Sequence, residues 1–163
     1  MLEDILKQIR AMLQNQLPGK LDQIELERAD GATLEDIQSF LVQGGGDNTT
    51  LRLDSRTKYP NVTIMGEATS ASNALSRRRE LWHRISVWVI NRQVSPDSEL
   101  AHTKLWRYVE AVERVLASDP TLGGKALDSV VVSHEYTLKG REEFVKGAIL
   151  TMGVLERPST SNY

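Results

Sequence analysis

The three histidines, His83, His102 and His134, are the side chains of this sequence best suited to metal binding or acid–base catalysis. None has the His-x-x-x-His or His-Glu-x-x-His spacing that places two ligands on one helix face. His134 is followed directly by Glu135, but this segment has the pattern of a strand, in which successive side chains point to opposite faces. We therefore expect no metal site.

The remaining residue types that do chemistry also lack the spacing of catalytic motifs. No Gly-x-Ser-x-Gly turn presents a nucleophile, and no Gly-x-Gly-x-x-Gly segment is present. Residues 44–48 are glycine-rich, but no Lys-Ser or Lys-Thr follows at the spacing of a phosphate-binding loop. The chain has no cysteine, which excludes disulfides and thiolate sites. We expect no enzymatic activity and no cofactor.

Basic side chains are concentrated at one place, the run Arg77, Arg78 and Arg79, with Arg84 and Arg92 nearby. Repetition of this run around a ring of subunits would multiply its charge and bring it close to DNA in a channel. No aromatic residue interrupts the run to stack on bases, and the net charge of the chain is -2. Proximity to DNA and ordinary solvated or inter-subunit salt bridges both remain open.

Length and composition suit one globular domain. The chain has 163 residues, of which 40% are hydrophobic and 26% charged. We expect a single domain over residues 1–158 and a flexible tail at 159–163. No apolar run reaches the roughly 18–20 residues of a membrane span, and Glu3 and Asp4 stand where a signal peptide needs basic residues. We expect a protein that folds in the cytoplasm and does not enter a membrane.

The first half of the chain gives mixed signals. Apolar residues at helical spacing predict a helix over 1–16, ended by Pro18. Thr33 resembles an N-cap and predicts a short helix over 33–41. The middle segment 20–76 otherwise has no clear pattern. Short strands are expected at 21–26, 51–54 and 62–65, and a linker or long loop at 66–76.

The second half has clearer patterns. Residues 81–93 alternate as a strand, with Trp82 and Trp88 on one face, so that face should be covered by a helix or by another subunit. Ser95 is a strong N-cap for a long helix over 95–116. Antiparallel strands are expected at 127–138 and 144–155. The pattern predicts an α+β domain, in which an N-terminal helix and one long central helix pack on a small mixed, largely antiparallel sheet.

The sharpest local signal lies between the central helix and the last two strands. Asp119 and Pro120 force the backbone out of the helix, because a residue before proline avoids helical angles. Gly123 and Gly124 permit positive φ. We interpret this segment as a structural hinge without a binding role.

Three segments carry a resemblance to a known family: 104–112 (KLWRYVEAV), 118–124 (SDPTLGG) and 148–154 (AILTMGV). Together they resemble the small neck and tail-completion proteins of tailed bacteriophages, and most of all the tail terminators. The resemblance covers residues 81–155. It implies a compact subunit of a ring, usually hexameric, that ends tail-tube polymerisation and joins the tail to the head.

The partners implied by the resemblance are further copies of the chain, the tail-tube protein, and a head–tail connector or head-completion protein. Genome DNA would pass through the ring without sequence-specific binding. The protein would be found in the virion, and in the host cytoplasm during assembly. Three alternatives stay open: a head-completion or connector protein, a nucleic-acid-binding module that uses Arg77–Arg79, and a small enzyme whose site is built from distant residues.

Overall fold

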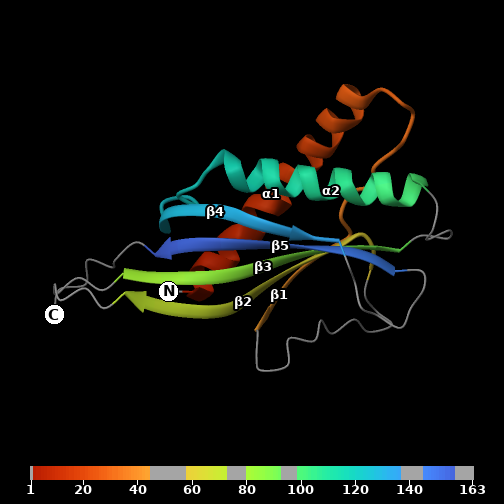
Figure 1. The fold of residues 1–163 in the computed structure, drawn as a ribbon. Coiled ribbons are helices and arrows are strands. Elements are labelled where there is room, and N and C mark those ends of the chain that lie inside the picture. Colours follow the sequence, from red (N-terminus) through yellow and green to blue (C-terminus); the bar gives the residue numbers. More distant parts are fainter. Residues whose placement is uncertain (1, 45–57, 73–79, 93–98, 137–144, 157–163) are drawn as a thin grey trace.

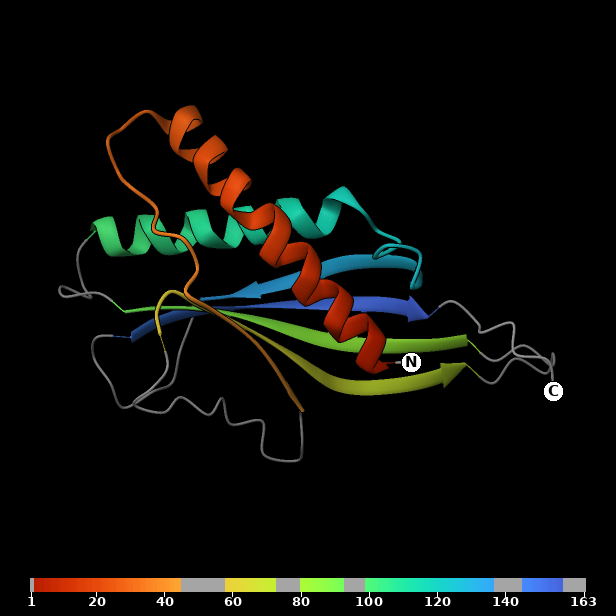
Figure 2. The ribbon, with the colours of Figure 1, turned by 180° about the vertical axis from the view of Figure 1, so that it is seen from behind.

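A computed structural model describes residues 2–44, 58–72, 80–92, 99–136 and 145–156. The elements in chain order are α1 (Leu2–Arg28), β1 (Ser39–Gly44), β2 (Asn61–Ser72), β3 (Glu80–Arg92), α2 (Glu99–Ser118), β4 (Ala126–Glu135) and β5 (Val145–Glu156). Both helices lie on one face of the sheet, and α1 crosses that face obliquely (Figures 1 and 2). This arrangement confirms the expected α+β class. Neither described helix is long and apolar enough to span a membrane.

The five strands form one mixed sheet in the order β1-β2-β3-β5-β4. Only the β1–β2 pair is parallel; β2–β3, β3–β5 and β4–β5 are antiparallel. The last strand, β5, therefore lies between β3 and β4, which run in the same direction and are connected through α2. The antiparallel pairing of the last two strands is confirmed.

The main hydrophobic core lies between the helices and one face of the sheet, and Met65 of β2 and Ile90 of β3 are also buried on the opposite face. Ile85, Val87 and Val89 of β3 are fully buried on this helix-covered side, and so are Leu13 of α1 and Val112 of α2. The core becomes thinner toward the two outer strands. There Phe40 and Val42 of β1, and Val131 of β4, are only partly buried against it.

The prediction that the first helix ends at Pro18 was wrong, because α1 continues to Arg28. Leu17, Leu21 and Ile24 extend the apolar stripe of the first three turns and are almost completely buried. Pro18 faces solvent, so its ring does not interrupt this packing. Burial of the stripe outweighs the cost of an internal proline, about 3 kcal/mol. The strand expected at 21–26 is part of the same helix.

The short helix expected at 33–41 was also wrong. The chain is irregular here and then forms β1, because tertiary hydrogen bonds hold its backbone. The Tyr108 hydroxyl donates to the Glu35 carbonyl oxygen at 3.0 Å. The Gln38 N–H donates to the Pro60 carbonyl oxygen at 2.8 Å. These partners are distant in sequence, so a local capping signal could not compete with them.

The prediction of a linker or loop over 66–76 was wrong for residues 66–72, because β2 continues to Ser72. After a register shift between Gly66 and Ala68, Ala68 to Ser72 pair with β3 from Arg84 to Glu80. Side chains 68–70 are exposed, so the strand has no apolar alternation that could reveal it. Predictions for residues 45–48, 51–54, 73–76, 95–98, 137–138, 144 and 159–163 lie outside the described residues.

Candidate functional site

Trp82 and Trp88 lie on the face of β3 that points away from the helices. They alternate with the core residues of β3, and their partners on β5 are Leu155 and Ile149. Trp82 is 40% exposed, whereas Trp88 is half-buried and its indole N–H donates to Ser86 Oγ at 3.0 Å. The shared face is therefore confirmed. The prediction that a helix covers this face was wrong for the described helices, because both lie on the other side of the sheet (Figure 1). Its coverage by another subunit stays a prediction.

Trp82, Val130 and Leu155 form an apolar group that we name the helix-free patch. Val130 is 53% exposed, and Leu155 is half-buried. Gly153 lies in register between Val130 and Arg84, and no atom lies within 4 Å of where its Cβ would be. The sheet surface is therefore low beside Val130, and the charged residues Asp128 and Arg84 stand in register next to Leu155 and Gly153. Exposed apolar side chains grouped on one face of a sheet are typical of a site of protein–protein contact.

The edge strand β4 adds further exposed apolar side chains. Leu127 is 45% exposed and Val132 is 63% exposed. Register shifts occur at both places, between Ala126 and Asp128 and between Val131 and Ser133. Such bulges are one way in which proteins limit pairing at an edge strand, so the regular part of this edge is the stretch from Asp128 to Val131. The apolar side chains exposed on either side of it are typical of a contact surface.

A cavity of about 210 Å³ lies between the end of α2, the hinge and β4. Its lining is mostly apolar and comprises Glu113, Leu116, Ala117, Pro120, Ser129, Val130, Val131 and Met152. Cavities of about 150 Å³ in protein cores bind benzene, so this one has room for one large apolar side chain. It lies directly beside the exposed edge of β4.

Residues 119–125 form the turn between α2 and β4 in which the hinge lies. The backbone takes positive φ at Leu122, Gly123 and Gly124, with values of 48°, 63° and 83°. The Asp119 carboxylate accepts hydrogen bonds from the hydroxyl and N–H of Thr121 at 2.6 and 3.0 Å, and from the N–H of Gly123 at 2.7 Å. These bonds lower the pKa of Asp119. Both carboxylate oxygens of Asp119 therefore accept hydrogen bonds from residues of the same turn.

A hydroxyl, an imidazole and a carboxylate meet where β2, β3 and β5 lie side by side. Thr69 Oγ1 is 2.7 Å from His83 Nδ1, and His83 Nε2 is 2.7 Å from Glu156 Oε2. These groups resemble a catalytic triad in type, but His83 is only 3% exposed and the cavity beside β4 does not border it. We interpret the group as a structural set of hydrogen bonds that links β2, β3 and β5. The sequence did not reveal it, because its members are 14 and 73 residues apart.

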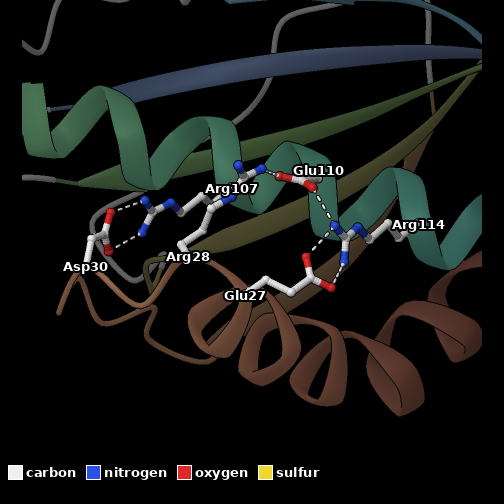
Figure 3. A network of polar contacts seen from close by, with 6 residues as sticks. All are labelled: Glu27, Arg28, Asp30, Arg107, Glu110 and Arg114. Atoms are coloured by element: carbon white, nitrogen blue, oxygen red, sulfur yellow. Dashed lines mark hydrogen bonds and ion pairs between the residues drawn. The ribbon is translucent and has the colours of Figure 1, made fainter.

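Charged side chains also join the end of α1 to α2. Figure 3 shows them: Glu27, Arg28, Asp30, Arg107, Glu110 and Arg114. Arg107 is 8% exposed and binds both carboxylate oxygens of Asp30. Glu110 accepts from Arg28 and Arg114 at 2.9 and 2.7 Å, and Arg114 also binds both oxygens of Glu27. Each of these charges has a partner of opposite sign, so the network holds the helices together and is not a binding site.

The Asp30–Arg107 pair predicts a contribution to acid stability. The hydrogen bonds from Arg107 lower the pKa of Asp30 from 3.8 to about 2. A carboxylate with a lowered pKa stabilises the fold fully above its unfolded value, and this stabilisation is lost as the pH falls from about 4 toward 2. In Asp30→Asn the melting temperature should be lower at neutral pH and should fall less over this range. Thermal unfolding from pH 7 to 2 tests this.

The control is Asp22→Asn, which removes the same charge from an exposed position of α1. It should keep the pH dependence of the unchanged protein. Equal loss of melting temperature in Asp30→Asn and in the unchanged protein between pH 4 and 2 would contradict the role given to the pair.

Arg77, Arg78 and Arg79 lie outside the described residues. Within the described part of the chain, no three His, Asp or Glu side chains are placed to hold a metal ion. Comparison with protein-family models and with curated proteins found no match to this chain.

Proposed function

We propose that this protein is a structural subunit of a ring at the head-proximal end of a phage tail, as a tail terminator or a closely related neck protein. The observation that carries the proposal is the exposed apolar surface on the sheet, formed by the helix-free patch and the edge of β4. A subunit that assembles needs such a surface, whereas a protein that stays monomeric tends to avoid it.

Two of the three segments of the resemblance lie beside the edge of β4, which supports the proposal. Residues 104–112 are part of α2, residues 118–124 include the hinge, and residues 148–154 are part of β5. Pro120 of the second segment and Met152 of the third line the cavity beside β4. The second and third segments therefore border the exposed edge, whereas the first lies on the helix-covered face, where Arg107 and Glu110 contact the end of α1.

Each ring would bury apolar surface between its copies. One rim would meet the tail-tube protein and stop its polymerisation, and the other would meet a connector or head-completion protein. Copies joined head to tail through two different surfaces close into a ring when the rotation between them divides a full turn. The hexamer implied by the resemblance is one such closure.

The assembly and its activity can be tested together. Size-exclusion chromatography with light scattering should give a multimer of defined size. The protein should also stop elongation of tubes formed by the tail-tube protein of the same phage, so that tubes become shorter and carry a ring at one end in electron micrographs. A protein that stays monomeric with and without tubes, and leaves tube length unchanged, would overturn the proposal.

A further inference from the structure

We propose that copies of this chain join through the unlike edges of their sheets, with β1 of one copy paired to β4 of the next. The sheet then continues from copy to copy. This inference rests on the ring proposed above and deepens it by naming the surfaces that join the copies.

Both edges have backbone groups available for pairing. Within the described residues, β1 pairs only with β2, and β4 pairs only with β5. The two strands lie at opposite ends of the sheet, so one copy can use both edges at once. Neither edge has a charged side chain at its centre: β1 reads SFLVQG, and the middle of β4 is Val130, Val131 and Val132. Because bulges keep an edge from pairing, the register shifts at Leu127 and Val132 confine the joint to the regular stretch from Asp128 to Val131.

The hydrophobic core is only partly covered at the two edges of the sheet, and the two edges differ in what they expose. Phe40 and Val42 of β1 are partly buried. They lie on the helix-covered side, because their partners on β2 are the core residues Val62 and Ile64. At the other edge, a mostly apolar cavity lies beside partly buried Val131. One edge therefore offers apolar side chains, and the other offers a cavity on the helix side that could receive one.

Strand direction also agrees with this pairing. From the parallel pair β1–β2, three antiparallel pairings lead across the sheet to β4, so β1 and β4 run in opposite directions within one copy. If the next copy continues the sheet in the same orientation, its β1 runs antiparallel to this β4. Antiparallel pairing is slightly more stable per residue than parallel pairing.

The other arrangements of this edge leave apolar groups uncovered. Pairing of β4 with the β4 of a second copy would give a two-fold dimer and leave Phe40 and Val42 of both copies at a free edge. An extended segment of another protein on β4 would do the same. Joining unlike edges covers both sites in every copy of a closed ring.

Cross-linking can identify the joint, because the chain has no cysteine and introduced thiols are its only ones. Leu41 on β1 and Val130 on β4 both lie on the face opposite the helices, as their partners Thr63 and Gly153 do. Leu41 is half-buried beside buried Thr63, and Val130 is 53% exposed, so a short cross-linker is needed. In Leu41→Cys/Val130→Cys, a short bismaleimide should produce a ladder of covalent multimers up to the size of the ring. Each single variant can form dimers at most.

Each outcome of the cross-linking decides something. A double variant that remains multimeric in light scattering but gives no ladder would overturn the edge joint and leave the ring proposal standing. Strong dimer formation by Val130→Cys alone would favour pairing of two β4 strands and also overturn the joint. A double variant that is monomeric, like the unchanged protein, would remove the ring proposal itself.

A charge at the edge gives an independent test. Val132→Lys places a charge on the middle of β4, where the side chain is 63% exposed, so the fold should be retained. We expect the multimer to be lost at concentrations where the unchanged protein is fully assembled, with the circular dichroism spectrum unchanged. Leu26→Lys is the matched control, because Leu26 is 82% exposed on α1, and it should assemble normally. Normal assembly of Val132→Lys would contradict the joint.

Discussion

Replacing Leu13 with alanine is expected to lower the free energy of unfolding by about 2–5 kcal/mol. Leu13 is 0% exposed and belongs to the cluster that joins α1 to the sheet. The loss combines the transfer free energy of the removed carbons with the cavity that they leave, since neighbours in a packed core relax only in part. Urea unfolding at a fixed protein concentration measures the change.

The same substitution at Leu26 is the control. Leu26 is 82% exposed on α1, so Leu26→Ala should change the free energy of unfolding by less than about 0.5 kcal/mol. Fixed concentration matters, because assembly adds its own free energy to the apparent stability. Similar effects of the two substitutions would show that α1 does not pack on the sheet as described.

Gly123→Ala is the second large effect that we expect, a loss of about 1–3 kcal/mol. Gly123 has φ of 63°, where a side chain is strained, and an added Cβ would lie 2.5 Å from Nε2 of Gln8 on α1. The amide side chain can move, so most of the loss comes from the backbone. Because its N–H also donates to Asp119, a backbone shift would weaken the turn that leads into β4.

Gly19→Ala is the matched control and should change the free energy of unfolding in the opposite direction. Gly19 lies inside α1, and no atom lies within 4 Å of its added Cβ. Alanine should raise the free energy of unfolding by about 0.5–1 kcal/mol, because glycine loses more backbone freedom in a helix. Urea unfolding measures both changes. A free energy of unfolding that rises in both variants, or falls in both, would contradict the strained conformation of the hinge.

The elements that the sequence predicted correctly are those with a local signal. The core residues Ile85, Val87 and Val89 of β3 recur at every second position, and α2 has a continuous apolar stripe, so each element was found within a few residues. The hinge was found because proline and glycine restrict or permit particular backbone angles. The end of α1 was misplaced, because the local effect of Pro18 was given more weight than the burial of Leu17, Leu21 and Ile24.

The candidate assembly surface could be predicted only in part. Alternation along β3 placed Trp82 and Trp88 on one face correctly. The identity of the edge strands depends on which strands pair, and β5 enters between two strands that precede it in the chain. The register shifts that accompany the exposure of Leu127 and Val132 are also set by pairing. No local pattern in residues 126–135 shows that they form an outer strand.

The position of β5 has a consequence for synthesis on the ribosome. When residues up to Glu135 have emerged, β4 has no neighbour in the sheet, because its described partner is β5. The central strand β3 also lacks its second partner until residues 145–156 have emerged. The nascent chain therefore exposes the apolar residues of β3 and β4 until residues 145–156 have emerged, a period in which incomplete sheets tend to aggregate. A transcript truncated before residue 145 would yield a chain without the strand that joins the two parts of the sheet.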